Sequence, residues 1–281
     1  MPTDYIDPAP ETKIGRMRGI IHALLTEHDA TGMLPTSARF LFYELVTRGT
    51  LSKEKDGARP PDHIVHSALT DLRERGHVPW EWIVDETRSL DDFTGAASVQ
   101  DWMTSVLEQA RLDPWQGDAP LVLTESRSLA GVLRPLCDRY AVRLAATGGQ
   151  VAGFLHTDII PRLQDGARVL YFGDWDLAGN DIEANTRRVL EQELDEPLRW
   201  ERVALTERQV TRYRLPIIIK HDKRFKDGRG VHEAVETEAL SQQLIIRLLQ
   251  RRLDQLLPQP LARVLAREAR QRKQLKALLR R

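Results

Sequence analysis

The stretch PLVLTESRSLAGVLRPLCDRYAVRLAAT at residues 120–147 decides the fold. It has an apolar run at each end, of the length of a short buried strand, and between them the apolar residues recur at the spacing of one helical face. Residues 167–176 (ARVLYFGDWD) and 200–205 (WERVAL) predict two further strands, each preceded by a helical segment. Strands that alternate with helices in this way predict a parallel sheet joined by helical crossovers. We therefore expect an α/β domain over residues 119–215, with helices flanking a parallel sheet.

Residues 1–90 predict a separate and mostly helical α+β domain. Its helical patterns cover residues 12–27, 36–47 and 62–75. Thr36 or Ser37 is a suitable N-cap for the second helix, and Gly76 is a suitable end for the third. The run HVPWEWIVD (77–85) is rich in Trp, Val and Ile, which predicts a strand. This order of elements is that of a winged helix-turn-helix DNA-binding domain, although other small α+β domains share it.

The rest of the chain predicts connecting and helical segments. Residues 91–118 contain one helical pattern between two polar breaks, which indicates a connector between domains. Residues 216–281 predict a basic loop followed by C-terminal helices. The last nineteen residues (263–281) carry eight basic side chains and one acidic one, so that helix is either a solvated surface or a phosphate-contacting one.

Composition is that of a soluble globular protein, with 41% hydrophobic and 29% charged residues. Basic and acidic residues number 41 each, so net charge neither favours nor excludes nucleic acid. The single cysteine, Cys137, excludes an intramolecular disulfide and favours a reducing compartment. The N-terminus lacks a signal pattern, and no apolar run approaches the roughly 18 residues that a membrane helix needs. We expect a cytoplasmic protein without a membrane partner, associated with the nucleoid if it binds DNA.

Carboxylates follow two of the predicted strands at the point where each strand ends. Glu125 ends the first strand, and Asp174 and Asp176 end the third. In a parallel sheet the carboxyl ends of the strands lie at one edge, where chemistry is usually found. Carboxylates that converge there repel one another unless a cation neutralises them, and Mg²⁺ prefers such oxygen ligands. The alternative is that Asp174 and Asp176 only cap the helix that follows them.

Three segments resemble the signatures of one family. TES (124–126) and FGDWDLAG (172–179) look like the paired motifs of the Toprim domain, which topoisomerases, primases and certain nucleases share. Between them, TGGQ (147–150) resembles the turn found in the topoisomerase VI A subunit and in its relative that initiates meiotic double-strand breaks. The resemblance covers residues 119–205, and the three segments occur in the order that the family shows.

This resemblance implies a metal-dependent site that acts on a nucleic-acid backbone. Glu125 would be the general acid/base and a metal ligand, and Asp174 and Asp176 would be metal ligands. The expected cofactor is Mg²⁺, with Mn²⁺ as an alternative ion.

The segment RFLFY (39–43) resembles the part of the topoisomerase VI A family that carries the tyrosine nucleophile. By this resemblance Tyr43 would attack DNA, and Arg39 would offset the charge of the phosphate. The same residues lie on an amphipathic helix, so Tyr43 could equally pack in the core or only contact DNA.

Basic residues in two segments are candidates for contacts with DNA phosphates. They are Arg73 and Arg75 at the end of the third helix, and Lys220, Lys223, Arg224 and Lys226 in KHDKRFKDGRG (220–230). The acidic stretch VETEAL (235–240) predicts the start of a helix, and it resembles a segment near the end of several such proteins.

The function that we expect from the sequence is Mg²⁺-dependent cleavage of duplex DNA, through a tyrosine-linked intermediate or by water. The hydrolytic version resembles the Toprim nuclease subunit of SMC-type plasmid-defence systems. Cleavage of both strands implies a homodimer, and because the chain has no Walker motif, any ATPase or SMC-type protein would be a separate partner. Alternatives are a non-catalytic DNA-binding regulator and an RNA-processing enzyme.

Overall fold

The computed structural model of the chain describes residues 5–53, 60–84, 94–148, 152–221 and 231–279. Lys223, Arg224 and Lys226, three of the predicted DNA contacts, lie outside these residues, as do Gly149 and Gln150 of the TGGQ turn.

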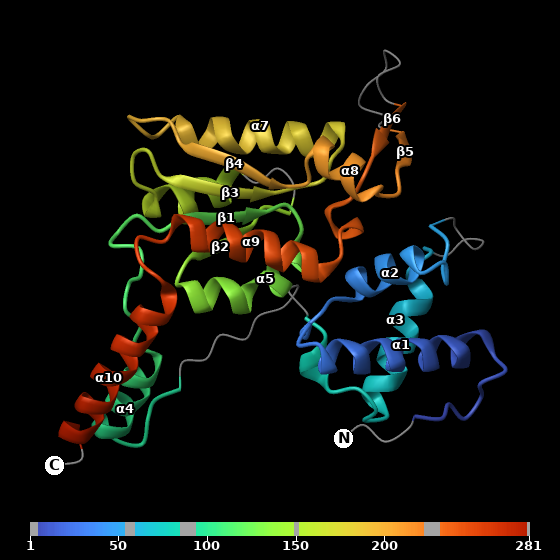
Figure 1. The fold of residues 1–281 in the computed structure, drawn as a ribbon, viewed down its shortest axis with the longest axis horizontal. Helices are drawn as coiled ribbons and strands as arrows, with labels where there is room; N and C mark the ends of the chain where they lie inside the picture. The colour runs from blue at the N-terminus through green and yellow to red at the C-terminus, as the bar shows by residue number, and fades with distance from the viewer. Residues whose placement is uncertain (1–4, 54–59, 85–93, 149–151, 222–230, 280–281) are drawn as a thin grey trace.

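A four-stranded parallel sheet lies at the centre of the larger part of the molecule (Figure 1). Its strands are β1 (Leu121–Thr124), β2 (Arg143–Ala146), β3 (Arg168–Phe172) and β4 (Arg199–Ala204), in the order β2-β1-β3-β4. In the register, Thr124 at the end of β1 lies opposite Phe172 at the end of β3. The α/β class and the four strands that were predicted within residues 119–215 are therefore confirmed.

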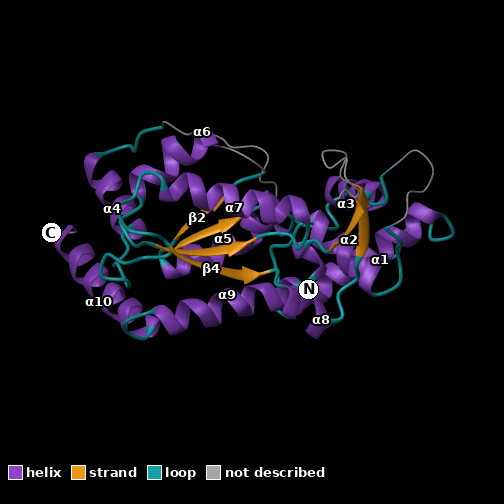
Figure 2. Cartoon of the chain, turned by 90° about the horizontal axis from the view of Figure 1, so that it is seen from above, coloured by secondary structure: helices purple, strands orange, loops and turns teal. Residues whose placement is uncertain are grey.

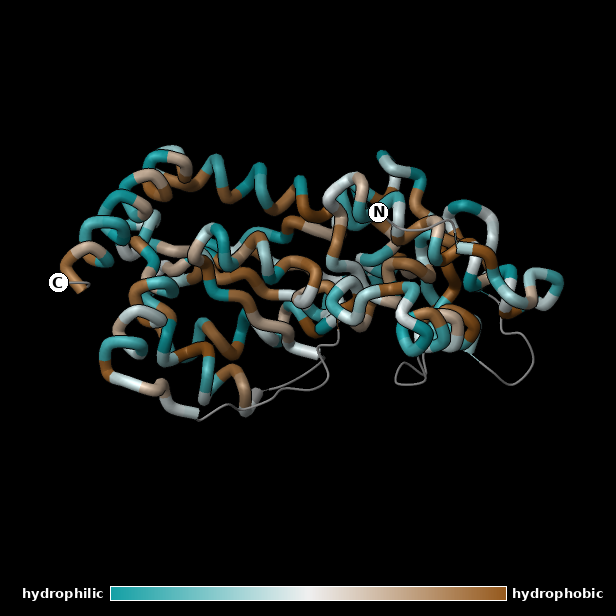
Figure 3. Tube along the Cα trace, turned by 90° about the horizontal axis from the view of Figure 1, so that it is seen from below, coloured by the Kyte–Doolittle hydropathy of each residue, from teal (hydrophilic) through white to brown (hydrophobic). Residues whose placement is uncertain are grey.

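Helices cover both faces of the sheet, which is why every residue of β1 is buried. On one face α5 (Arg127–Tyr140) and α9 (Gln242–Leu256) pack against Val122, Leu170 and Phe172. On the other face lie α7 (Leu177–Glu191) and the segment formed by α6 (Ala152–Phe154), η2 (Leu155–Ile159) and η3 (Ile160–Arg162). In Figure 3 the tube is brown along the central strands, while the surrounding helices alternate between teal and brown turns.

A helical unit precedes the sheet and lies beyond the carboxyl ends of its strands (Figures 1 and 2). It contains α1 (Lys13–Ala30), α2 (Ala38–Thr47) and α3 (His63–Glu74), whose apolar faces form one buried cluster. The Ser37 hydroxyl accepts a hydrogen bond from the Phe40 N–H and caps α2, as predicted. Gly76, with φ of +73°, follows the end of α3, also as predicted.

The prediction of a strand over residues 77–85 is wrong. The structure has a short 3-10 helix, η1 (Trp80–Trp82), and a single β-bridge between Thr36 and Ile83. Pro79 and Trp80 explain the difference. Pro79 supplies no N–H for a strand ladder, and Trp80 is 58% exposed with its ring under the Arg73 guanidinium. The wing of a winged helix is therefore not present among the described residues of this unit.

The segment after β4 also differs from the expected loop and helices. After α8 (Glu207–Tyr213), β5 (Ile218–His221) and β6 (Val231–Ala234) form an antiparallel pair, so the expected basic loop is flanked by strands. The predicted helix start at 235–240 is instead a single 3-10 turn, η4 (Thr237–Ala239), and α9 begins only after its N-cap, Ser241.

The predicted connector contains α4 (Val99–Gln109), which packs beside α10 (Leu261–Leu279) at the end of the molecule far from α1 (Figure 2). Among the described helices, none has both the length and the apolar character that crossing a membrane requires.

Candidate active site

The carboxyl edge of the sheet brings Glu125 and Asp174 together. Glu125 follows β1 directly, and its N–H donates to the Phe172 carbonyl at 2.9 Å, which continues the β1–β3 ladder by one residue. Its side-chain Oε2 in turn accepts a hydrogen bond from the Asp174 N–H at 3.3 Å. Adjacent parallel strands thus place residues that are 49 positions apart within hydrogen-bond distance.

Asp174 also anchors the segment that follows β6. Its Oδ1 accepts hydrogen bonds from the Thr237 N–H at 2.8 Å and from the Thr237 hydroxyl at 3.0 Å. The neighbouring Trp175 forms a β-bridge with Val235. Burial, followed by the negative charge of Glu238, raises the pKa of Asp174.

Asp176 caps α7 and also pairs with a lysine. Its Oδ1 accepts from the Gly179 N–H at 2.6 Å, and its Oδ2 accepts from Lys220 Nζ at 2.8 Å. Burial favours its neutral form, but these two hydrogen bonds outweigh that effect and lower the pKa of Asp176. Gly179 is required here, because a Cβ on it would lie 2.5 Å from the Asp174 carbonyl oxygen. Capping, which the sequence left open as an alternative to metal binding, is therefore one role of Asp176.

Glu125 has the properties of an acid/base group near neutral pH. Burial, followed by the charge of Asp174, raises its pKa to about 7. A carboxyl group with such a pKa can take up or release a proton at physiological pH.

The donor set is compatible with a hard divalent cation at Glu125 and Asp174. Both carboxyl groups are crowded and have raised pKa values, so a cation would relieve their repulsion. Each oxygen of Asp176 already accepts one hydrogen bond, so Lys220 would compete with a cation for this carboxylate. Within the described ranges, no three or more His, Cys, Asp or Glu residues are grouped as a ready metal site.

A second acidic group joins the sheet edge to the N-terminal unit. Arg39 of α2 pairs through Nη2 with Glu236 at 3.1 Å and through Nε with Glu238 at 3.2 Å. The Glu238 side chain is completely buried, and its Oε1 also accepts from the hydroxyls of Ser126 and Ser128. Arg39 thus lies close to Asp174, one of the predicted metal ligands. The two residues are 135 positions apart in the sequence, and a separation of that size gives no information on contact. The E-x-E pattern of VETEAL was the available signal for this acidic group.

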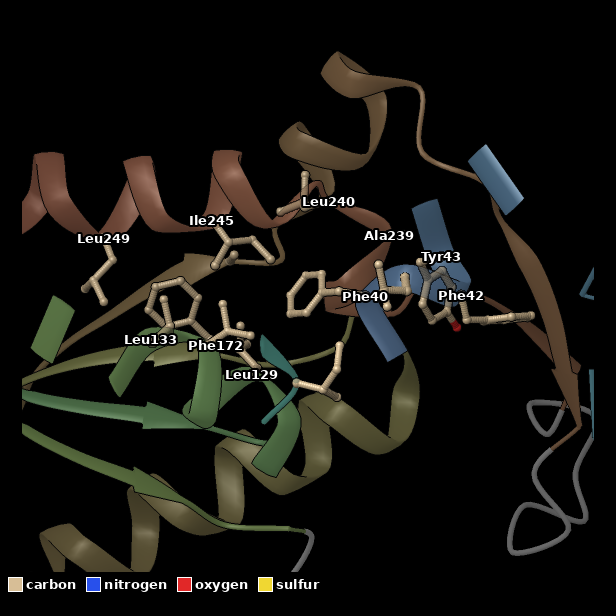
Figure 4. Close-up of a cluster of buried hydrophobic side chains, with 14 of the residues drawn as sticks. Phe40, Phe42, Tyr43, Leu129, Leu133, Phe172, Ala239, Leu240, Ile245 and Leu249 are labelled. Atoms are coloured by element: carbon tan, nitrogen blue, oxygen red, sulfur yellow. The ribbon is translucent and has the colours of Figure 1, made fainter. Parts of the chain in front are cut away.

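Tyr43 lies at the rim of the same region. It is 6% exposed and packs edge-on against Phe42, with ring centroids 5.4 Å apart (Figure 4). It nevertheless lines a cleft of about 700 Å³ between α2, α3 and the start of α5. An adjoining hollow of about 400 Å³ is lined by Glu125 and Asp174.

The two hollows share three lining residues, Arg39, Arg127 and Ser128. Tyr43, the predicted nucleophile, and the carboxylates Glu125 and Asp174 therefore border two neighbouring hollows with a shared wall that includes Arg39, whereas Asp176 lines neither of the two. Arg127, which no sequence motif marked, is exposed and stands at the first position of α5.

The remaining predicted DNA contacts differ in their surroundings. The Arg73 guanidinium lies 4.2 Å from the centre of the Trp80 ring, donates to the Trp80 carbonyl and lines the cleft. Arg75 is exposed at the end of α3. Lys220 is paired with Asp176, so it lies at the carboxylates rather than on an open surface.

Comparisons with known proteins add nothing to this geometry. No family model, no curated protein and no solved structure matches the chain. The chemistry of the site has to be inferred from its own side chains.

Proposed function

We propose that the chain cleaves the phosphodiester backbone of duplex DNA in a Mg²⁺-dependent reaction, as a Toprim-type enzyme similar to the topoisomerase VI A subunit. The observation that carries this proposal is a pair of neighbouring hollows, one lined by Glu125 and Asp174 and the other by Tyr43, which share Arg39 and Arg127 in their walls. The acidic side chains at the edge of the parallel sheet are suitable ligands for a metal ion. Arg39 and Arg127, which line both hollows, are suitable donors to a phosphate.

The proposed metal ligands are Glu125, Asp174 and Asp176. A bound Mg²⁺ would supply positive charge that polarises the phosphate and stabilises its developing charge. Glu125 would also transfer a proton, since its pKa of about 7 allows both states near neutrality. Arg39 pairs with Glu236 and Glu238 through Nη2 and Nε, and its remaining N–H groups would donate to the phosphate.

In the covalent version of the reaction, Tyr43 Oη loses its proton and forms a bond to phosphorus. One ester bond between phosphorus and a deoxyribose oxygen breaks, and that oxygen takes up a proton. The strand end is then stored as a phosphotyrosine that can be resealed.

The second candidate is hydrolysis of the same bond by water, as in a defence nuclease. The low exposure of Tyr43, which is 6%, favours this version, because an attacking phenol has to reach the phosphate. The carboxylates and Arg39 would have the same roles in both reactions.

A plasmid assay tests the proposal. Wild-type protein should nick or linearise supercoiled DNA with Mg²⁺, and EDTA should stop the reaction. Asp174→Ala should lower the rate at least about 100-fold, as for loss of a catalytic electrostatic group. Asp181→Ala is the matched control, because Asp181 is an exposed carboxylate on α7. Cleavage by Asp174→Ala at the wild-type rate would contradict the metal-site assignment.

Two further arms separate the candidate reactions and substrates. Tyr43→Phe should abolish a protein–DNA adduct that survives denaturation if the reaction is covalent, and should leave the rate unchanged if it is hydrolytic. Duplex DNA and structured RNA, offered side by side, distinguish a DNA enzyme from an RNA-processing one. Sedimentation with DNA tests the proposed homodimer, and addition of an ATPase or SMC-type protein tests the need for a partner.

A further inference from the structure

Helix α4 carries an exposed apolar stripe. None of the eleven residues of this helix is buried. Four apolar side chains recur at the spacing of one helical face and are between 43% and 76% exposed, namely Val99, Trp102, Met103 and Val106. An amphipathic helix of a globular domain normally turns such a stripe toward the core, whereas this one faces outward.

Polar contacts hold α4 against α10. The Gln100 side chain donates to the Leu279 carbonyl at 2.8 Å, and Lys276 pairs with Glu108 at 2.7 Å. Both contacts are exposed to solvent, where such interactions contribute little to stability. A helix of this length is also marginal in water by itself, so burial of the stripe would supply stabilisation that the helix pair needs.

The apolar surface continues onto α10. Leu275 and Leu278 are 48% and 61% exposed, and Leu278 directly precedes the residue that accepts the hydrogen bond from Gln100. With about 100 Å² for a whole aliphatic side chain and about 200 Å² for tryptophan, the six side chains expose roughly 400 Å² per copy. A stable interface buries about 800 Å² per partner, and somewhat more than half of it is apolar. The patch therefore has the apolar area of one side of a stable dimer interface.

The α4 stripe is complementary to itself. Two α4 helices that pack antiparallel about a two-fold axis between Trp102 and Met103 place Val99 of one copy opposite Val106 of the other. Trp102 then lies opposite Met103, so a rigid aromatic side chain meets a flexible one that can adapt to it. A second copy of the chain can thus cover the whole stripe.

The charges of α4 also permit self-association. Its two charged residues are Asp101 and Glu108, and the antiparallel arrangement places them opposite Thr104 and Ala97. Neither carboxylate therefore meets its own copy, and Glu108 is already paired with a lysine. A strongly acidic or basic partner would gain little from a stripe that is uncharged.

We propose that the α4 stripe, together with Leu275 and Leu278, is the interface of a homodimer. The helices α4 and α10 lie at the end of the molecule far from α1, whereas the candidate active site adjoins the N-terminal unit (Figures 1 and 2). Such a dimer leaves both sites open and holds them far apart, each with its own stretch of DNA. The inference goes beyond the proposed function, because it does not require that the chain cleaves DNA.

Sedimentation of the protein without DNA tests the interface. Wild type should sediment as a dimer that dissociates on dilution. Trp102→Glu should raise the dissociation constant at least about 100-fold, because a buried tryptophan is a typical hot spot and each substitution acts twice in a symmetric interface. Ile20→Glu, at an exposed apolar residue of α1, is the matched control and should keep the wild-type constant. The circular dichroism of Trp102→Glu should match that of wild type, since the residue is exposed in the single chain.

Thiol cross-linking tests the antiparallel arrangement. A short bis-maleimide should join Val99→Cys to Val106→Cys in a mixture of the two proteins, because these positions lie opposite one another. Each variant alone should cross-link several-fold less, since two copies of one position would lie about 10 Å apart along the helices. The native Cys137 is buried and should not react.

The results that would overturn the inference are distinct from those that concern cleavage. Wild-type protein that stays monomeric at every concentration would overturn it, as would equal dissociation constants for Trp102→Glu and Ile20→Glu. Cross-linking of either cysteine variant alone that equals or exceeds that of the mixture would overturn the antiparallel arrangement. A wild-type dimer that leaves DNA intact would overturn the proposed function and leave the interface supported.

Discussion

Replacing Arg39 by alanine should leave the Glu238 carboxylate buried without its counter-cation. The Glu238 side chain has no exposed surface, whereas the Arg39 side chain is 42% exposed. Arg39 is also the connection between α2 and the acidic turn at the sheet edge, so this substitution tests how the N-terminal unit is held over the carboxylates.

The size of the effect follows from what remains after the substitution. Removal of one partner of a buried ion pair costs about 3–5 kcal/mol. Two serine hydroxyls still donate to Glu238 Oε1, and Arg39 is partly solvated, which reduces the loss. We therefore expect Arg39→Ala to lower the free energy of unfolding by about 2 kcal/mol.

Urea denaturation of a double-mutant cycle measures the interaction. Glu238→Gln removes the charge and keeps an oxygen for the serine hydroxyls, so Arg39→Ala should cost less in that background. The expected coupling energy is about 1–2 kcal/mol. Arg75→Ala, a change at an exposed arginine of the same unit, should alter stability by less than about 0.5 kcal/mol.

Additive effects within about 0.5 kcal/mol would refute this reasoning, because they would show that Arg39 does not compensate the charge of Glu238. So would an Arg39→Ala variant as stable as wild type.

Three further predictions concern the pH, the metal requirement and the strand edge. The hydrogen bonds of Arg18 lower the pKa of the buried Asp7 carboxyl, so their stabilisation is complete above the ordinary value of 3.8 and is lost as pH falls below it. Urea denaturation of Asp7→Asn should therefore give a free energy of unfolding about 3 kcal/mol below that of wild type at pH 7 and a smaller deficit in acid, and an equal deficit at pH 3 would contradict this. Lys220→Met removes the ammonium group that competes with a cation for Asp176, which we expect to favour metal binding by about 1 kcal/mol. The Mg²⁺ concentration for half-maximal cleavage should therefore fall several-fold. An unchanged or higher requirement would argue against a metal role for Asp176. Gly179→Ala places its Cβ 2.5 Å from a backbone carbonyl and should cost about 2 kcal/mol in urea denaturation, and a neutral effect would show that this turn can relax.

The central sheet and the meeting of Glu125 with Asp174 could be predicted because they depend on local patterns. Buried parallel strands are continuous apolar runs, and residues that follow adjacent strands share one edge. Once the strands at 121–124 and 168–172 are recognised, the position of both carboxylates follows without knowledge of the rest of the fold.

The neighbours of those carboxylates depend on tertiary packing, and the sequence pattern does not contain them. Thr237 reaches Asp174 only because the β5–β6 pair returns the chain to the sheet edge. Lys53 stands in the charged run SKEKDG, which is typical of a solvated loop, and only the fold brings it over the Tyr43 ring. The prediction of a strand at residues 77–85 was wrong for a related reason. Trp80 packs against the Arg73 guanidinium and does not take part in a β-sheet hydrogen-bond ladder.

A crystal of the protein soaked with Mn²⁺ tests the central claim most directly, because the ion can be located by its anomalous scattering. The account predicts a Mn²⁺ peak bonded to carboxylate oxygens of Glu125 and Asp174, and no peak there in Asp174→Ala. Crystals in which Mn²⁺ binds elsewhere, while the edge formed by β1 and β3 remains empty at saturating metal, would contradict it.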